Sequence, residues 1–298
     1  MELKRPLSLD EQIARLISHK MDIDDVDYAL QVLSNTNYYR LTGYALQFRD
    51  EENPDDYIPG TKFEDMVKLH EFDKAFACLL KPYLDSIELY IRSKIAYIFS
   101  MAKCHNSPYD QHYDPHNFHK KKSHNHIIIS SLNREKKHSK DSLFVIHHDK
   151  QYKGKMPLWV IVELISFTNL SKLYSAMYNS EQDLIADAIG TSKKTLKNHL
   201  KCLANLRNKV AHLSRLYNVV YNPPVILGHT FLQDYPEVRS NTLFAYLIAI
   251  LRRLPSNDAR KTLIENIIRL IKEYSDCIRL SLLGFPDNYT DILHHEIK

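Results

Sequence analysis

Apolar residues recur three or four positions apart along most of this 298-residue chain, whereas the alternating pattern of β-strands is scarce. The longest such run includes Met66, Leu69, Phe72 and Phe76, and it resumes at Tyr83. This spacing places apolar side chains on one face of an α-helix, where they can pack into a core. The pattern predicts an all-α fold, and no internal repeat is visible.

Local signals place the ends of several expected helices. Ser8-Leu9-Asp10-Glu11 and Thr61-Lys62-Phe63-Glu64 have the residue order of a capping box, in which two side chains satisfy each other's backbone N–H groups. Pro82 is expected to kink or break the long helix, because proline has no N–H to donate. Further helices are expected at residues 23–33, 157–174, 183–189, 192–217, 241–254 and 257–283.

Composition excludes several classes of protein. The six glycines are far apart, so neither a dinucleotide-binding G-x-G-x-x-G nor a P-loop can form. The four cysteines contain no C-x-x-C pair, which predicts neither a zinc ribbon nor a disulfide framework. The first residues form no apolar signal segment, and no run of 18 apolar residues occurs, so we expect a cytoplasmic protein without membrane contact.

The positive charge is concentrated in one stretch. The whole chain has a formal net charge of +4, whereas residues 117–155 contain ten Lys or Arg and three Asp or Glu, a net charge of +7. Such a segment can attract the phosphates of a nucleic acid. A solvated, partly mobile insertion is the alternative interpretation. Residues 103–155 are mostly polar, and we expect them to be an insertion into the helical core that carries short elements.

Arg207-Asn208-Lys209-Val210-Ala211-His212 is the stretch that comes closest to a catalytic constellation. A histidine with a pKa near neutral can move a proton, and a guanidinium can stabilise the charge of a phosphorane. The asparagine can orient the histidine or the scissile phosphate. Together they predict RNA cleavage by attack of a ribose 2′-OH on the adjacent phosphorus, without a metal ion or other cofactor.

A structural interpretation of the same stretch stays open. On a helix from 192 to 217, Arg207 occupies the apolar stripe, where a charge needs a partner. It would then form a buried salt bridge with Glu88 or Glu163, and His212 would be a core histidine. Arg207 and His212 are about 140° apart at roughly 100° per residue, so the helix is expected to meet a second subunit that closes the pocket.

Residues 183–200 support a different function. They have the spacing of a helix-turn-helix with Gly190 in the turn and Thr191 or Ser192 capping the second helix. In a DNA-binding regulator without catalysis, the side chains facing the major groove would be those of Lys193, Lys194, Lys197 and Asn198. Recognition helices are usually short and exposed, whereas this helix continues into the Arg207 stretch and carries an apolar stripe.

Two further clusters have a functional and a structural interpretation. Nine histidines between positions 105 and 148 suggest a metal site, but no H-E-x-x-H spacing occurs, and we favour a surface loop in which only His147-His148 merits a test. Tyr38, Tyr39 and Tyr44 beside Arg40 are able to stack on bases, and we favour a core role for them.

Several pieces of the chain form a pattern by their order and spacing. They are Tyr38-Tyr39-Arg40-Leu41-Thr42-Gly43-Tyr44, Phe72-Asp73, Ile87-Glu88 with Arg92, Pro157-Leu158-Trp159 with Glu163, Ser166-Phe167, and Leu206-Arg207-Asn208 with Ala211-His212 and Arg215. In these pieces the chain resembles the abortive-infection (Abi) proteins of the AbiD/AbiF type, which belong to the HEPN superfamily of helical ribonucleases. The resemblance spans roughly residues 20–220, and Thr168 stands where these proteins commonly have glycine.

The resemblance implies a HEPN-like helical bundle at residues 61–222. The helical patterns and the composition of the chain add an N-terminal helical extension (1–60), the basic insertion at about 103–155, and a C-terminal helical segment (223–298). It implies an endoribonuclease toxin or antiphage effector that forms a homodimer and is restrained by an antitoxin such as a noncoding RNA. The implied catalytic residues are Arg207, Asn208 and His212. The residues expected to bind RNA are Lys120, Lys121, Lys122, Arg134, Lys136, Lys137, Arg40 and Arg215.

Overall fold

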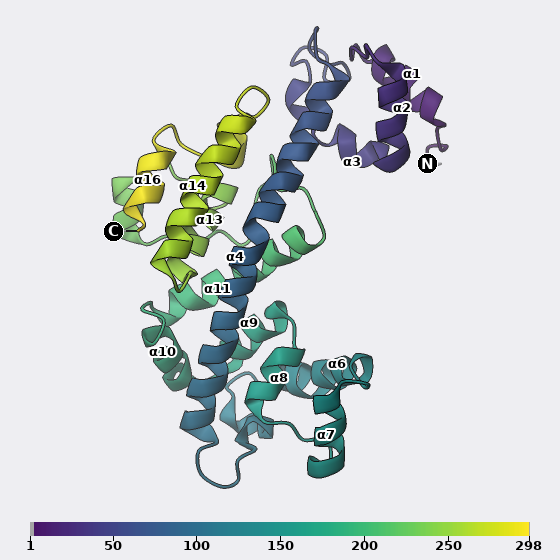
Figure 1. Ribbon diagram of the computed structural model, residues 1–298. Coiled ribbons are helices and arrows are strands. Elements are labelled where there is room, and N and C mark those ends of the chain that lie inside the picture. The colour runs from purple at the N-terminus through teal and green to yellow at the C-terminus, as the bar shows by residue number, and fades with distance from the viewer. Residues whose placement is uncertain (1–2, 298) are drawn as a thin grey trace. The chain divides into compact units, whose positions relative to one another are not determined.

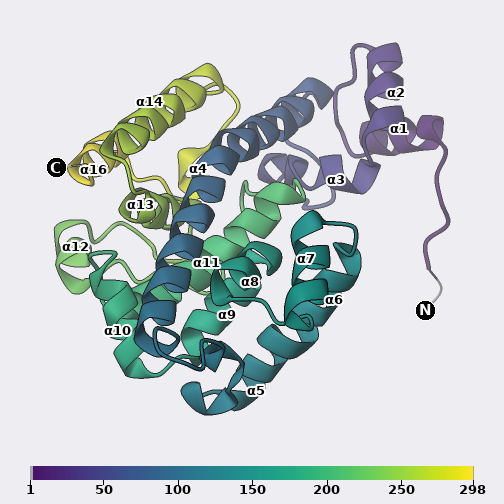
Figure 2. The same ribbon diagram turned by 60° about the horizontal axis from the view of Figure 1, so that its bottom comes forward.

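The computed structural model describes residues 3–297, except the side chain of Lys122. It confirms the all-α prediction: helices α1–α16 follow one another along the chain, together with short 3₁₀ and π helices (η1–η4). Figures 1 and 2 show the course of the chain through them. Within the described range, β-pairing is limited to isolated bridges. No helix of residues 3–297 is both long and apolar enough to cross a lipid bilayer.

The chain forms two compact units, and each unit combines segments that are far apart in the sequence. The predicted division at residues 60 and 222 differs from them and stays a prediction, because compactness alone does not identify segments that fold independently. The first unit is Met1–Cys78 with Ile267–Arg279, and the second is Leu79–Asn266 with Leu280–Lys298. Two helices, α4 (Phe63–Lys103) and α14 (Asn257–Glu273), contribute residues to both units.

The first unit confirms one predicted capping box and refutes the other. Ser8 caps α1, and Glu11 completes the reciprocal bond. At the start of α4, the Thr61 hydroxyl donates to a carbonyl of the preceding loop, and Asp65 accepts from the N–H of Lys62 instead. Besides the beginning of α4 and the end of α14, this unit contains α1 (Leu9–Ser18), α2 (Val26–Asn35), α3 (Tyr38–Thr42) and η1 (Ala45–Phe48).

Helix α4 is continuous through Pro82, so the break considered from the sequence does not occur. Proline cannot donate to the carbonyl of Cys78, and one bond of the helical ladder is lost there. The helix persists because its flanks bury apolar side chains, among them Phe76, Leu80 and Leu84. Cys78 is also the last residue before the boundary between the two compact units.

The second unit is built around α11 (Lys193–Ala211), which packs against α9 (Phe167–Ala176), α10 (Asn179–Asp187) and α13 (Leu243–Arg253). Ten of the 11 residues of α13 are buried, which explains why its apolar pattern could be recognised. The pattern expected at 157–174 is divided into α8 (Leu158–Leu164) and α9, because Ser166 caps a new helix. The unit also contains α12 (His229–Asp234), α15 (Leu280–Leu283) and α16 (Tyr289–His295).

Residues 103–155 form short helices of the second unit, as expected, and they pack into its core. Phe118 stacks on Phe99 of α4 with ring centroids 5.2 Å apart, and on His124 with centroids 4.3 Å apart. Ile127 and Ile128 are fully buried as well. The elements are η2 (Gln111–Tyr113), η3 (Pro115–Asn117), α5 (Lys121–His124), the π helix η4 (Asn125–Ser131), α6 (Leu132–His138) and α7 (Leu143–Tyr152).

Three histidines interpreted as surface-loop residues are buried instead, namely His112, His124 and His148. His112 Nε2 donates to the carbonyl of Met156 at 2.9 Å, and His124 Nε2 donates to the carbonyl of His112 at 2.7 Å. Burial lowers the pKa of His112 and keeps its ring neutral. These histidines are hydrogen-bonded core residues. Within the described residues, no group of three or more His, Cys, Asp or Glu side chains is placed to hold a metal ion.

Candidate functional site

The end of α11 differs from the prediction. The helix stops at Ala211 with His212 as its C-cap, whereas the apolar pattern predicted a helix to residue 217. The residues after Ala211 therefore do not continue the apolar stripe of this helix. His212 stands at the very end of the helix, where its side chain is exposed, so the interpretation as a core histidine is wrong.

A left-handed residue ends the helix. Leu213 has φ of +48°, a conformation that costs a side-chain-bearing residue roughly 1–2 kcal/mol and is usually taken by glycine. Its N–H donates to the carbonyl of Val210, and the Ser214 N–H donates to the carbonyl of Lys209 at 2.8 Å. These two bonds form a Schellman motif. Because no glycine follows His212, the sequence contains no signal for this turn.

Arg207 is held by a buried carboxylate of another helix. Its Nε lies 3.1 Å from Oε2 of Glu88 on α4, and the Glu88 side chain is 6% exposed against 36% for Arg207. The other carboxylate oxygen accepts from Nη2 of Arg92, which is one turn further along α4. Glu88 is one of the two partners expected from the sequence. The other, Glu163, is exposed.

This cluster carries an excess of positive charge. One carboxylate lies between two guanidiniums, and Nη1 of Arg92 is buried without a hydrogen-bond partner among the described residues. Buried charges are costly unless they are paired, so the cluster favours the approach of an anion. About a third of the Arg207 side chain stays exposed. Its guanidinium is thus oriented by Glu88 and still accessible.

The side chain of Asn208 is held by Thr168, the residue that stands where the resembling proteins commonly have glycine. Its Nδ2 donates to Oγ1 of Thr168 on α9 at 3.1 Å. Glycine at position 168 would have no hydroxyl to accept this bond. Threonine therefore orients the amide of Asn208, and the departure strengthens the local arrangement.

His212 and Asn208 line the same open pocket, which has a volume of about 280 Å³. The preceding turn of α11, the loop after the helix and one residue of α13 supply the remaining walls. Tyr246 of α13 is buried, and burial raises the pKa of its phenol, so it stays protonated. The other lining residues are Asn205, Lys209, Ser214, Tyr221 and Asn222.

The sequence interpretation missed Lys209 and Tyr221. Nζ of Lys209 lies 5.9 Å from the centre of the Tyr221 ring, within the range of a cation–π contact. The Tyr221 hydroxyl donates to the carbonyl of Leu216 at 3.1 Å, which fixes the ring. The charge of Lys209, inside the Arg207–His212 stretch, was a usable signal. Nothing in the sequence distinguishes Tyr221 from a core tyrosine.

Arg207 does not line this pocket. Helix α11 brings Asn208 and His212 together and turns Arg207 toward Glu88, in agreement with the angular separation expected from the sequence. In a single chain, the pocket offers a proton-transfer group, an amide and the ammonium of Lys209. Such a set can bind a phosphate and move a proton beside it.

The sequence model of the Abi-like protein family matches residues 31–218, which is more than half of the chain. The chain belongs to the Abi-like protein family. Glu88, Thr168 and the whole Arg207–His212 stretch lie within the matched residues. Family membership suggests a role in abortive infection, a defence against phages. No curated protein and no solved structure matches the chain.

The residues expected to bind RNA in this Abi-like protein differ in accessibility. Lys120, Lys121 and Lys137 are exposed. Lys120 lies close to Lys197 of α11, and burial together with this second ammonium lowers the pKa of Lys197. An anion between the two lysines would relieve their repulsion. The side chain of Lys122 lies outside the described residues.

The other predicted RNA-binding residues have contacts within the protein. Arg134 pairs with the adjacent Glu135. Lys136 is 17% exposed and braces the turn after α7, where it donates to Asp149 and to the carbonyl of Gly154. Arg215 is half-buried and has contacts of its own. Arg40 is exposed, also has contacts, and belongs to the first compact unit.

A turn joins the two helices of the expected helix-turn-helix, and some of the side chains expected to face DNA have contacts within the protein. Gly190, with φ of +71°, joins α10 to α11, and Ser192 caps α11. Lys193 pairs with a carboxylate of α10 at 2.8 Å. Asn198 donates to the carbonyl of Pro224 and accepts from the N–H of Ile226. Two of the four side chains expected to face DNA are thus engaged inside the protein.

The tyrosine cluster of the first unit is divided between two roles. Tyr44 is buried, and its hydroxyl donates to Asp73 at 2.8 Å, which confirms the core role for this residue. Tyr39 is 86% exposed, so the core role does not apply to it. Tyr38 is intermediate between them.

Proposed function

We propose that this Abi-like protein is an endoribonuclease that acts as an antiphage effector or toxin. One observation carries the proposal. An exposed histidine at the end of α11 shares a pocket with Asn208 and Lys209, while Arg207 is accessible and oriented by a buried carboxylate. A purely structural motif would not leave His212 exposed beside a cation in a cavity.

The chemistry follows from the groups present. His212 accepts the proton of a ribose 2′-OH as the oxygen attacks the adjacent phosphorus, or donates a proton to the departing 5′-oxygen. Lys209 and Arg207 are the cations that stabilise the negative charge on the phosphorane oxygens. Asn208, anchored by Thr168, orients the phosphate. The histidine and the cations supply proton transfer and charge stabilisation, so the reaction is proposed to need no metal ion.

A homodimer is part of the proposal. Since Arg207 lies outside the lining of the His212 pocket, a second chain whose own α11 approaches this region would bring an arginine and a histidine to one phosphate. A toxin of this kind also has to be restrained in its own cell. We propose that an antitoxin, such as a noncoding RNA held by the basic segment, has that role.

The decisive experiment is a product assay in EDTA. The wild-type protein should leave 2′,3′-cyclic phosphate ends on RNA. His212→Ala and Arg207→Ala should each lower the rate by about 10²–10⁴-fold, the usual contribution of such groups. His229→Ala is the matched control, because His229 is exposed in the same unit and lies outside the pocket. RNA that stays intact but bound would favour the regulator, and cleavage by His212→Ala at the wild-type rate would refute the assignment.

The basic segment is tested by the salt dependence of RNA binding. Each phosphate contact should contribute roughly 0.7–0.9 to the slope of log affinity against log salt concentration. The triple substitution of Lys120, Lys121 and Lys137 by alanine should reduce the magnitude of this slope by the contribution of about one to three phosphate contacts. The control triple is Lys172, Lys201 and Lys261, which are also exposed. Equal slopes for the two triples would make the segment an ordinary solvated surface.

A further inference from the structure

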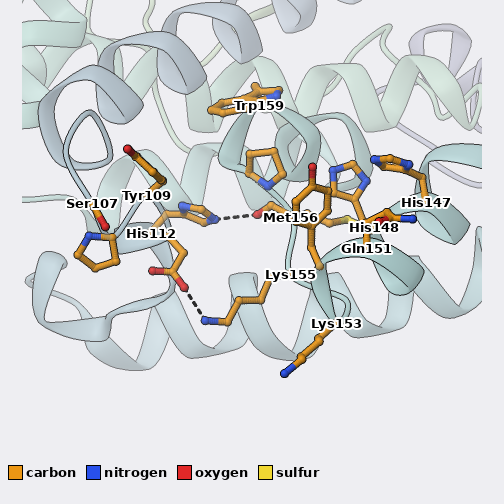
Figure 3. Close-up of a pocket in the computed structure, with 14 residues that line it drawn as sticks. Ser107, Tyr109, His112, His147, His148, Gln151, Lys153, Lys155, Met156 and Trp159 are labelled. Carbon is orange, nitrogen blue, oxygen red and sulfur yellow. Dashed lines mark hydrogen bonds and ion pairs between the residues drawn. The ribbon is translucent and has the colours of Figure 1, made fainter.

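A second cavity of the same compact unit lies apart from the His212 pocket. It has a volume of about 780 Å³ and shares no lining residue with that pocket. Three segments form it: the loop before η2, the end of α7 with the turn that follows, and the chain that leads into α8 (Figure 3). Its volume is in the range of roughly 300–1,000 Å³ typical of sites for small organic ligands.

Large aromatic side chains line this cavity and remain exposed. Trp159 is 59% exposed, Tyr109 is 68% exposed and Tyr152 is 57% exposed. They come from three different segments, so no single helix face explains their exposure. Exposed apolar surface gathered in one place usually marks a binding site. The faces of such rings are stacking platforms for nucleobases.

A cation on a fixed turn accompanies the aromatic residues. Lys153 lines the cavity, is exposed, and forms no ion pair within the described residues. Its backbone is left-handed with φ of +51°, and Gly154 follows with φ of +77°. Lys136 fixes this turn by its bond to the Gly154 carbonyl. In the view of Figure 3, Trp159 is at the top of the lining and Lys153 at the bottom.

The other charges of the cavity compensate one another. Asp110 pairs with Lys155, and this bond holds the pKa of Asp110 below its ordinary value. The buried ring of His112 is neutral, because burial lowers its pKa, and it is already bonded to the carbonyl of Met156 (Figure 3). Lys153 is therefore the unbalanced charge of the lining. A ligand that combines a flat aromatic part with a negative group matches this arrangement.

We propose that this cavity binds one nucleotide unit, with its base stacked on Trp159 and Tyr109 and its phosphate paired with Lys153. The unit is supplied either by a free mononucleotide or by one residue of a single-stranded RNA, since both present a base and a phosphate. The site is independent of cleavage at His212, because the two pockets have no residue in common.

The fluorescence of Trp159 provides a direct test, because Trp159 is the only tryptophan of the chain. The full-length protein is titrated with adenosine monophosphate and, separately, with a 2′-O-methyl oligoadenylate that cannot be cleaved by a 2′-OH. Saturable quenching by the mononucleotide would show that a free nucleotide is sufficient for binding to this cavity. Quenching by the oligonucleotide alone identifies an RNA strand as the source. Both outcomes support the site, and no saturable quenching by either probe overturns it.

Two variants and two matched controls test the proposed contacts. Lys153→Ala and Tyr109→Ala should each weaken binding of the quenching probe about tenfold, the lower range for a phosphate contact or a stacked base. Lys150→Ala and Tyr97→Ala should leave it unchanged, because both residues are exposed and lie outside the lining. A variant that binds like its control overturns the contact assigned to it, and circular dichroism verifies that each variant is folded.

A third variant separates this site from the ribonuclease site. His212→Ala should keep the wild-type affinity for the quenching probe, whatever happens to its RNA cleavage. Loss of the quenching in His212→Ala would overturn the independence of the two pockets. Conversely, a protein that cleaves RNA normally but shows no quenching would overturn the nucleotide site alone.

Discussion

The middle of α11 and its C-terminal end use polar side chains in opposite ways. In the middle, His199 is fully buried and donates to the carbonyl of Ile226 at 2.9 Å, and Asn198 is bonded to the same loop. At the end, Asn208 and His212 line an open pocket. One helix thus uses Asn198 and His199 to bind a loop of its own chain, whereas Asn208 and His212 stay accessible.

His199 inside α11 and His212 at its C-cap differ in whether they can transfer a proton at neutral pH, because one is buried and the other is exposed. Burial, with the positive charges of Arg253 and Arg252 nearby, lowers the pKa of His199 to about 3. At neutral pH its ring is an uncharged hydrogen-bond donor and cannot serve as an acid. His212 has the same side chain, but it stands where the helix ends and solvent enters. Position along the helix therefore decides which histidine is a candidate for chemistry.

The largest effect is expected from Glu88→Gln, which removes the carboxylate that holds Arg207 at the candidate site. The buried guanidinium of Arg92 and the partly exposed one of Arg207 would lose their shared carboxylate, and the free energy of unfolding should fall by about 3–5 kcal/mol. Denaturation by urea measures it. Glu163→Gln is the control, because Glu163 is exposed and should change stability by less than about 0.5 kcal/mol. Equal stability of the two variants would mean that Glu88 does not hold Arg207.

Acid should lower the free energy of unfolding, because His199 in the middle of α11 is buried in its neutral form. Because the folded pKa of His199 is below its ordinary value of about 6.5, the unfolded chain binds more protons as pH falls below 6.5, and stability is lost from there toward pH 3. Between pH 7 and pH 5, His199 should contribute a loss of about 2 kcal/mol at 1.36 kcal/mol per unit. Burial lowers the pKa of His112 too, which acts in the same direction.

Two variants isolate this contribution. His199→Gln keeps a donor for the carbonyl of Ile226 but does not titrate, so unfolding measured at both pH values should depend less on pH than in the wild type. His229→Gln, at an exposed position, should retain the wild-type pH dependence. If His199→Gln retains it as well, the buried histidine is not the source.

The smallest effect concerns the turn that ends α11. Leu213→Gly should relieve the left-handed strain and raise the free energy of unfolding by up to about 1 kcal/mol. The same change loosens the turn beside His212, so RNA cleavage should become slower while the melting temperature rises. Leu184→Gly, at an exposed position inside α10, should instead destabilise by about 1 kcal/mol. A Leu213→Gly variant that melts lower than the wild type would show that this turn is unstrained.

The helices that bury a broad apolar face could be predicted from the sequence. The apolar pattern of α13 and the capping box at Ser8 were sufficient to predict these helices, because both signals depend on residues that are close together in the sequence. Other boundaries depend on tertiary contacts. Burial on both sides carries α4 through Pro82, and the turn at Leu213 has no glycine to signal it.

The candidate site was predictable in its residue types but not in its geometry. The separation of Arg207 and His212 and the partnership with Glu88 follow from helical spacing and charge, and both could be expected. The exposure of His212 could not, because it depends on where α11 ends. The bond from Asn208 to Thr168 joins residues 40 positions apart, and no local pattern indicates it.

The first compact unit has a consequence for synthesis on the ribosome. Its early residues are completed by residues that are synthesised much later: Gln47 donates to the carbonyl of Cys277, and the ring of Phe72 lies 5.5 Å from that of Tyr274. The nascent N-terminal segment therefore has to wait for more than 200 further residues before it can close its core. During that interval its apolar side chains are exposed, and a chain released early would be a substrate for proteases.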